Sequence, residues 1–467
     1  MKTVKFRIEK RYRWVLIPLV IGLIALVLIP QMFLVQETRK DAWTRIRSTG
    51  QLVALTDKNS LDYFLYRGEP KGYQLELLES LARYLGVSLR ILASDDISHS
   101  WYYLAHHAGD LLAWNLPVSP ESKYLVSFTA PFWESRYVVI QRGPKFILDP
   151  KDFSGDTVYA EKNPFLVSLV GHFTRLTHGR AIVAEKAGVG QEDLARQVSE
   201  GKIRFAICTE NMAQVMKRNF RNLDTRLVIS HFIRFSWGVN TDSDSLRDKV
   251  NEWLSDPGTQ KEIRKIYLTY YDNPKIPGCL NSDYCSLVKN RISPYDDEIR
   301  KYSRIIGWDW RLLASLIYEE SNFHSEPVSS RNAKGLMQLV PETAEKFGMD
   351  SLSGTAQQIL SGVRYLKWLD RQLPPEITIP RERVCFILAA YNVGIGRVLT
   401  AREKAARFGK DPNRWNGNVD YFLTRKSKKN PYGEPESEID LSPFGEPGSY
   451  VDKILTRYYH YRNLITP

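Results

Sequence analysis

Between residues 50 and 271, the apolar positions alternate between short β-rich runs and longer helical runs. The runs LVALT at 52–56 and LRILAS at 89–94 are typical of strands, and YQLELLESLARYLG at 73–86 is typical of an amphipathic helix. Further strand-like runs are RYVVIQR, DTVYA, RFAICT and RLVIS, and further helix-like runs are EDLARQVSEG and SLRDKVNEWLSD. This alternation predicts an α/β layered domain over 45–272 with a largely parallel sheet.

From residue 295 onward the pattern changes to helical spacing throughout, which predicts an all-α domain over 295–467. The helical runs are WDWRLLASLIYEES, PETAEKFG, TAQQILSGVRYLKWLDRQL, RVCFILAAYNVGIGRVLTA and SYVDKILTRYYHYRNL. Residues 273–294 are rich in Pro, Gly, Asn, Asp and Ser, which indicates a linker. Residues 402–449 are polar, and we expect them to form a surface excursion.

The first 35 residues form a basic segment followed by an uncharged one. Residues 1–13 carry six Lys or Arg and one acid, and residues 14–35 carry no charge. An uncharged run of this length is long enough for a helix that crosses a bilayer, and the basic flank predicts a cytoplasmic N-terminus. We therefore expect an inner-membrane signal anchor with the bulk of the chain in the periplasm. The alternatives are a cleaved signal peptide and an outer-membrane association, although no small-x-small cleavage site or lipobox Cys follows the run.

The length and net charge of the chain set only broad limits on its class of protein. A chain of 467 residues is expected to form two or three domains. The net charge of +12 suits an anionic partner such as membrane headgroups or peptidoglycan carboxylates, or equally a solvated basic surface. No nucleic-acid-binding motif accompanies it. We expect no cofactor and no metal.

The four cysteines fall into two groups. Cys279 and Cys285 lie in a Pro/Gly-rich stretch and are placed to close a small disulfide loop in an oxidising compartment. Cys208 and Cys385 lie in apolar runs and are expected to be small buried hydrophobic residues.

Glu320 is the candidate catalytic residue. On a helical wheel it falls within the stripe formed by Leu313, Leu316 and Ile317. Burial and the negative end of the helix dipole both favour the protonated carboxyl, which is the form that a general acid for glycosidic-bond cleavage needs near neutral pH.

Several short motifs around Glu320 resemble those of the soluble-lytic-transglycosylase family, which has a lysozyme-like catalytic domain. They are Glu320-Ser321, Ser329, Gly335-Leu336-Met337-Gln338, Pro341, Thr343-Ala344, the run 389–394 (AAYNVG), and more loosely Gly445-Glu446 with Tyr450-Val451. Asn332 stands where the family usually has Gly, and Asn tolerates positive φ, so the loop conformation is expected to persist.

The resemblance implies roles for further residues. Ser329, Met337, Gln338, Tyr391, Asn392 and Tyr450 would contact the substrate or the acid. A loop-capping Ser329, a core-filling Met337 and a helix-packing Tyr391 remain the structural alternatives.

Residues 45–272 resemble the periplasmic solute-binding proteins of the amino-acid-binding type. The resemblance rests on Gly50 to Ala54, Gly72 to Leu77, Leu85-Gly86-Val87, Asp110 to Leu112 and Phe128 to Phe132. That family usually holds the ligand carboxylate with an Arg in the segment that here reads SPESK, where Lys123 is the nearest cation. Because Lys does not replace a forked Arg contact, we expect no ordinary amino-acid binding. A peptidoglycan fragment or a peptide stem is the hypothesised ligand of this regulatory domain.

The order of the two domains, solute-binding-like first and transglycosylase-like second, resembles that of the membrane-bound lytic transglycosylases. This resemblance implies cleavage of the bond between N-acetylmuramic acid and N-acetylglucosamine, with Glu320 as the single acid/base and a 1,6-anhydromuramic acid product. A lysozyme-type hydrolase and a non-catalytic peptidoglycan- or solute-binding sensor are the alternatives.

Overall fold

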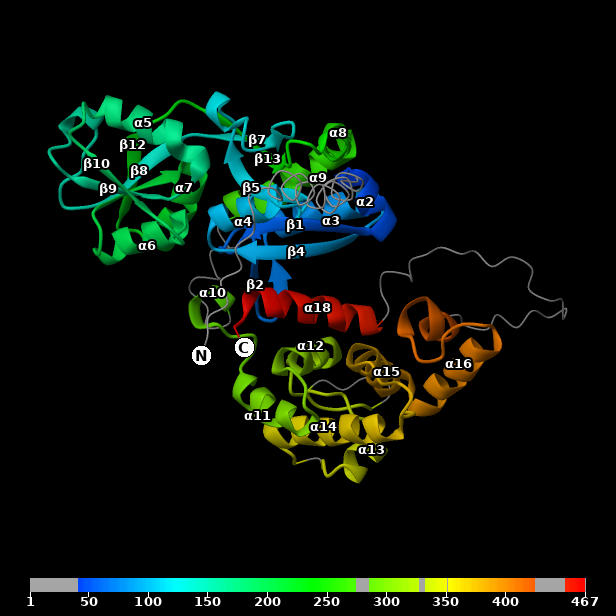
Figure 1. The fold of residues 1–467 in the computed structure, drawn as a ribbon. Coiled ribbons are helices and arrows are strands. Elements are labelled where there is room, and N and C mark those ends of the chain that lie inside the picture. Colours follow the sequence, from blue (N-terminus) through cyan, green and yellow to red (C-terminus); the bar gives the residue numbers. More distant parts are fainter. Residues whose placement is uncertain (1–40, 274–284, 327–331, 351, 425–449, 467) are drawn as a thin grey trace, which may run out of the picture.

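The computed structural model describes residues 41–273, 285–326, 332–350, 352–424 and 450–466 (Figure 1). The predicted membrane segment at 14–35, Cys279 and Ser329 lie outside these ranges, as does most of the predicted surface excursion. Within the described ranges, no helix combines the length and the hydropathy that a bilayer crossing requires.

The first lobe of the α/β part is built on a sheet with the strand order β4-β1-β5-β13-β6, with β7 also paired to β13. Its strands are β1 (Gln51–Asp57), β4 (Ser88–Ser94), β5 (Leu111–Pro117), β6 (Ser127–Phe128), β7 (Trp133–Ser135) and β13 (Ile233–Val239). Strand β1 pairs in parallel with β4 and β5. A separate hairpin joins β2 (Phe64–Tyr66) to β3 (Glu69–Lys71).

The second lobe contains a sheet with the order β10-β9-β11-β8-β12. Its strands are β8 (Tyr137–Arg142), β9 (Thr157–Glu161), β10 (Ile182–Lys186), β11 (Phe205–Thr209) and β12 (Leu223–Val228). All the strand-like runs identified in the sequence overlap strands of the two lobes.

The predicted largely parallel sheet needs correction, because both sheets are mixed. In the first lobe β13 is antiparallel to β5, and in the second β8 is antiparallel to β11 and β12. The chain leaves the first lobe before β8 and returns to it at β13. Strands β8 and β13, which follow the two crossings between the lobes, therefore run opposite to the strands that the strand–helix–strand units place in parallel.

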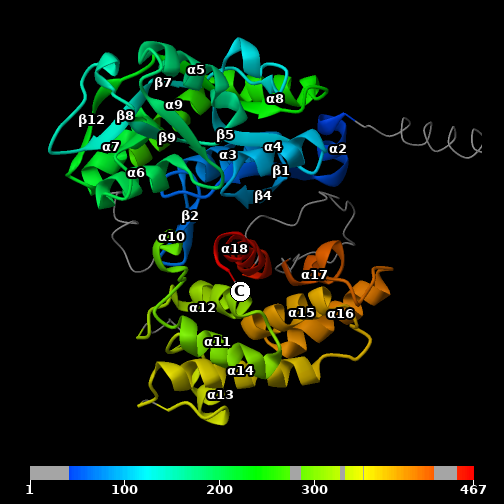
Figure 2. The same ribbon diagram turned by 60° about the vertical axis from the view of Figure 1, so that its left-hand side comes forward.

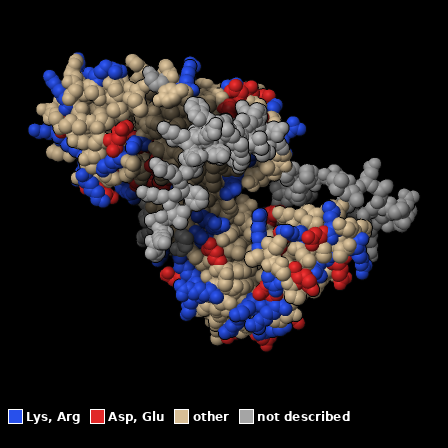
Figure 3. All heavy atoms as spheres, in the orientation of Figure 1, with Lys and Arg blue, Asp and Glu red and all other residues tan. Residues whose placement is uncertain are grey.

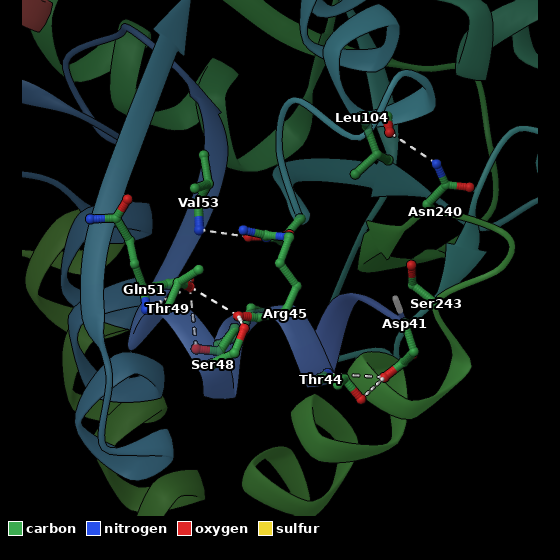
Figure 4. A network of polar contacts seen from close by, with 12 residues as sticks. Asp41, Thr44, Arg45, Ser48, Thr49, Gln51, Val53, Leu104, Asn240 and Ser243 are labelled. Atoms are coloured by element: carbon green, nitrogen blue, oxygen red, sulfur yellow. Dashed lines mark hydrogen bonds and ion pairs between the residues drawn. The ribbon is translucent and has the colours of Figure 1, made fainter. Parts of the chain in front are cut away.

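Eight helices flank these two sheets. They are α2 (Ala42–Thr49), α3 (Tyr73–Leu85), α4 (Ile97–Ala105), α5 (Val167–Leu176), α6 (Gln191–Glu200), α7 (Glu210–Asn219), α8 (Asp244–Ser255) and α9 (Pro257–Tyr267). Helix α2 shows how the domain begins (Figure 4). Asp41 caps it by accepting a hydrogen bond from the Thr44 backbone N–H at 3.1 Å. Asp110 pairs with Arg45 of α2 and accepts a hydrogen bond from the Val53 N–H at 2.8 Å, which ties α2 to β1.

The C-terminal part is helical, as predicted. Its helices are α10 (Ser286–Lys289), α11 (Asp296–Ile306), α12 (Trp310–Ser321), α13 (Pro341–Lys346), α14 (Thr355–Gln372), α15 (Pro380–Val393), α16 (Ile395–Arg407), α17 (Asp420–Thr424) and α18 (Tyr450–Leu464). The run around AAYNVGIG was expected to form one helical segment, but it divides at Gly394, whose φ of 89° lies outside helical geometry. The missing Cβ makes this break accessible.

Helix α18 lies between the first lobe and the helical part in both ribbon views (Figures 1 and 2). The hydroxyls of Tyr459 and Tyr461 donate to the carbonyls of Ile91 and Gly68, at 2.9 and 2.6 Å. The Tyr63 hydroxyl and His460 Nδ1 are 2.7 Å apart. The last helix of the chain therefore packs on the first lobe as well as on α12 and α15.

Basic and acidic side chains are interspersed over the face of the molecule shown in Figure 3. The net charge of +12 does not gather into one basic patch on this face. Charge alone therefore does not mark a polyanion-binding surface there.

Candidate functional site

Helix α12 carries the candidate acid at its C-terminal end. The Asp309 side chain caps its first turn by accepting from the Arg311 backbone N–H at 3.0 Å. The helix ends at Ser321, and the next residue, Asn322, adopts a left-handed conformation with a φ of 48°. Leu313 and Leu316 are fully buried, so Glu320 lies in the last turn beside a packed apolar stripe, as the helical wheel predicted.

Glu320 meets Tyr450, the first residue of α18. The Tyr450 hydroxyl donates a hydrogen bond to Oε1 of Glu320. The two residues are 130 positions apart in the chain, and the packing of α18 on α12 brings them together. This contact agrees with the prediction that Tyr450 borders the acid.

The environment of Glu320 favours its protonated form. Burial raises the pKa of Glu320 to about 7; the hydrogen bond from Tyr450 opposes this rise and the negative charge of Glu319 adds to it. A carboxyl with a pKa near 7 is still partly protonated at neutral pH, so it can donate a proton to a leaving group.

The adjacent carboxylate, Glu319, has different surroundings. Its Oε2 accepts a hydrogen bond from Arg457 Nη1 at 2.8 Å, and its Oε1 lies 3.7 Å from Lys453 Nζ. Both basic residues belong to α18, four positions apart and so on one face of the helix. We did not predict this ion-pair cluster, although the four-residue spacing of Lys453 and Arg457 was a usable signal.

The Gly335–Gln338 turn is fixed against α12. The Ser321 hydroxyl donates to the carbonyl of Leu336 at 2.8 Å, and the Leu336 N–H donates to Oε1 of Gln358 at 2.9 Å. Gly335 has a φ of 77°, and a Cβ there would come within 2.6 Å of the Gln358 side chain. Only glycine fits this position without displacement.

Two other residues near the turn adopt positive φ. Gln338 has a φ of 46°, and its Nε2 donates to the Gly335 carbonyl at 3.0 Å. Asn332 has a φ of 56°, a left-handed conformation that Asn tolerates.

Tyr391 of α15 contacts the Gly335–Gln338 turn. Its hydroxyl donates to the Met337 carbonyl at 2.6 Å, which fits the alternative of a packing tyrosine with a satisfied hydroxyl. Burial, followed by the negative charge of Glu320, raises the pKa of Tyr391, so this residue also lies near the acid. Its neighbour Asn392 is exposed to solvent.

Met337 occupies the core. Its side chain is 1% exposed and packs against Gly362, where a Cβ would come within 2.2 Å of the Met337 Sδ atom. This placement matches the core-filling alternative. Met337 therefore supports the site through its backbone carbonyl and its packing.

Three of the four cysteines lie within the described residues. Cys285 is disulfide-bonded, and its predicted partner Cys279 lies outside the described residues. Cys208 and Cys385 are free and buried, as predicted.

Two protein families match consecutive parts of the chain. "Bacterial extracellular solute-binding proteins, family 3" matches residues 52–273, and "Transglycosylase SLT domain" matches residues 297–413. The solved structure of the P235GK mutant of ArgBP from T. maritima is 16% identical, covers 50% of this chain and all of its own, and superposes with a TM-score of 0.44.

Longer matches extend over both parts together. A protein of Desulfosudis oleivorans named membrane-bound lytic murein transglycosylase F is 25% identical over 91% of this chain and 92% of its own length. A protein of Stutzerimonas stutzeri with the same name is 29% identical over 90% of this chain and 86% of its own. The chain therefore combines a family 3 solute-binding domain with a transglycosylase SLT domain, and it is a homologue of the proteins named membrane-bound lytic murein transglycosylase F.

Proposed function

We propose that this chain is a peptidoglycan lytic transglycosylase in which Glu320 is the single acid/base. The observation that carries the proposal is the surroundings of Glu320: an apolar helix face, one hydroxyl donor from Tyr450, and a pKa raised by burial to about 7. The SLT domain and the named relatives give the reaction class.

The first half of the reaction needs a proton donor. Glu320 transfers its proton to the glycosidic oxygen between N-acetylmuramic acid and N-acetylglucosamine while the bond from that oxygen to C1 breaks. The 2-acetamido group of the substrate stabilises the positive charge at C1. The Tyr450 hydrogen bond holds the carboxyl in position for this transfer.

The second half uses the same carboxyl as a base. The Glu320 carboxylate takes the proton from the muramic-acid 6-hydroxyl, and O6 bonds to C1 to close the 1,6-anhydro ring. No water is consumed, and Glu320 regains its proton. Both reacting groups belong to one sugar, so the effective molarity is high.

A second carboxylate is what a hydrolase would ordinarily place across the bond. The carboxylate that acts electrostatically on Glu320 is Glu319, which is engaged with Arg457 and Lys453. This pairing favours the transglycosylase over a lysozyme-type hydrolase. The proposed substrate contacts of Gln338, Tyr391, Asn392 and Ser329 complete the site.

We further propose that the chain is divided into a membrane segment, two domains and a linker. Residues 14–35 anchor the chain in the inner membrane, residues 45–272 form a regulatory domain, residues 273–294 a linker and residues 295–467 the lysozyme-like catalytic domain.

The proposed lytic activity is tested by mass spectrometry of sacculi digested by the full chain. Anhydro-muropeptides are expected; products heavier by one water would indicate a hydrolase, and no products a non-catalytic sensor.

A further inference from the structure

A cavity of about 550 Å³ lies between the two lobes of the solute-binding part. Asp57, the last residue of β1, and Glu161, the last residue of β9, both line it. Ser286 of α10 and Leu464 of α18 border it from the C-terminal part of the chain. Ends of parallel strands are where α/β sheets place ligand-binding groups.

Seven acidic residues line this cavity, and burial raises the pKa of four of them. Asp57 and Asp62 come from the first lobe, and Glu161 and Glu192 come from the second. Among the described residues, none of the four forms an ion pair with Lys, Arg or His. Burial raises the pKa of Asp57, and the negative charges of Asp62, Glu161 and Glu192 raise it further. The charged groups that act most strongly on Asp57 are therefore like charges.

The first-lobe pair is oriented by a single amide. Asn59 Nδ2 donates to Asp57 Oδ2 at 2.7 Å and to Asp62 Oδ2 at 2.8 Å. Asn59 Oδ1 accepts from the backbone N–H groups of Leu61 and Asp62, both at 2.8 Å. Because its oxygen is occupied by these donors, Asn59 presents its NH2 group to both carboxylates.

Glu161 is held in the same way in the second lobe. Its Oε1 accepts from Asn163 Nδ2 at 3.0 Å and from Gln191 Nε2 at 3.2 Å. The oxygens of these amides accept from the backbone N–H groups of Phe165, at 2.9 Å, and Thr209, at 2.8 Å. Three amides thus hold three carboxylates as oriented acceptors.

Two buried polar atoms at this cavity have no protein partner. Oδ1 of Asp62, a residue that is 3% exposed, and Nε1 of Trp114, which is 8% exposed, form no hydrogen bond. Both residues line the cavity. A buried acceptor and a buried donor without partners are costly, so a ligand that satisfies both would be stabilised.

The side chains argue against an amino-acid carboxylate as the recognised group. Lys123, the nearest cation in the sequence segment that usually supplies the clamp, is exposed and does not line the cavity. Four basic side chains do line it. Lys58 pairs with Asp95 and Arg196 with Asp193, Lys186 donates to Gln197 Oε1 at 3.0 Å, and Lys162 is exposed. Within the described residues, no group of three His, Cys, Asp or Glu side chains is arranged to hold a metal ion.

We propose that this cavity binds an organic cation: a ligand that presents ammonium groups to Asp57, Asp62 and Glu161 and a hydrogen-bond acceptor, such as an amide oxygen, to Trp114. Charge-assisted hydrogen bonds to carboxylates supply the recognition. The apolar side chains of Ile97 and Met212 at the cavity wall suit an aliphatic stem. This inference does not depend on the lytic activity proposed above.

Calorimetric titration of the full chain in detergent with a matched ligand series tests this inference. L-lysinamide carries two ammonium groups and a carbonyl, L-norleucinamide carries one ammonium group, and hexanamide carries none. Affinity is expected to fall along this series, by about tenfold at each lost charge. L-lysine, which adds a carboxylate, is expected to bind no tighter than L-lysinamide. Equal binding of hexanamide, much tighter binding of L-lysine, or no binding of L-lysinamide would overturn the proposal.

Variants locate the binding. Asp62→Asn keeps the side-chain shape and removes a charge, and it is expected to weaken L-lysinamide binding about tenfold or more. Trp114→Phe is expected to weaken it less, since it removes one donor. Glu252→Gln, on the exposed face of α8, and Glu320→Gln are the matched controls and are expected to bind as the unmodified chain does. Loss of binding in Glu320→Gln, with Asp62→Asn unaffected, would place the cation in the catalytic domain and contradict the inference.

Discussion

The candidate catalytic site and the cavity between the lobes both bury carboxyl groups, but they surround these groups with different hydrogen-bond donors. Glu320 receives one hydroxyl donor, from Tyr450, beside an apolar helix face, and its pKa rises to about 7. Glu161 receives two amide donors, and Asp57 and Asp62 share a third. A sparsely bonded carboxyl becomes a proton donor, whereas an array of oriented carboxylates becomes an acceptor for a cation. Burial raises the pKa of the acids in both regions, so the regions differ in the number of amide donors and in the like charges that face the acids of the cavity.

The largest effect is expected at the proton donor. Glu320→Gln retains the shape and the Tyr450 contact but carries no transferable proton, so release of anhydro-muropeptides should fall by at least about 10³-fold. Product yield from purified sacculi, quantified by mass spectrometry, gives the measurement. Glu326→Gln, an exposed residue, is the control and should digest normally. Full activity of Glu320→Gln would remove this residue from the mechanism.

Tyr450→Phe sharpens the comparison by removing the single donor. The Tyr450 hydrogen bond lowers the pKa of Glu320, so its loss should raise that pKa. With Glu320 as the general acid, the rate falls as pH rises through about 7. This falling limb of the pH–rate profile should move to higher pH in the variant. Loss of positioning should also reduce the rate by about tenfold. A limb that moves to lower pH would contradict this assignment.

Asp62→Asn tests the other region through stability. Burial raises the pKa of Asp62 to about 6 from an ordinary value of 3.8. The contribution of Asp62 to stability is therefore most favourable below about pH 4, and it is lost as pH rises from there through about 6, because the unfolded chain ionises first. At pH 8 without ligand, the variant should be more stable by about 1 kcal/mol. Thermal unfolding at pH 8 and pH 4 checks this, because the difference should shrink at pH 4.

Glu319→Gln is expected to give the smallest effect. The negative charge of Glu319 raises the pKa of Glu320, so its removal should lower that pKa. The released positive charges of Arg457 and Lys453 act in the same direction. The falling limb of the pH–rate profile should move to lower pH, opposite to the Tyr450→Phe shift. Shifts of the two variants in the same direction would show that another group sets the limb.

The position of the candidate acid on a buried helix face was predictable because its signal is local. Glu320 falls on an apolar stripe that twelve consecutive residues define, and GLMQ and AAYN are short contiguous motifs. The strand and helix runs of the solute-binding part were predictable for the same reason. The antiparallel strands were not, since their direction depends on which lobe the chain comes from.

The acidic cavity was missed because its residues lie far apart in the sequence. Asp57 and Glu192 are separated by 135 positions, and only the approach of the two lobes unites them: Glu192 accepts from the Ser60 backbone N–H at 2.8 Å. A signal existed nonetheless, since Asp57 and Glu161 are the last residues of their strands and each is followed two residues later by an Asn. The position of α18 between the domains depends on packing that no local pattern encodes.

The central claim is that burial keeps the Glu320 carboxyl protonated near neutral pH. It is tested most directly by an NMR titration of the full chain labelled with ¹³C at the glutamate side-chain carboxyl carbons, in which Glu320→Gln identifies the resonance. A midpoint near pH 7 is expected. A midpoint near the ordinary value of 4.5 would show an ionised residue at neutral pH and contradict the account.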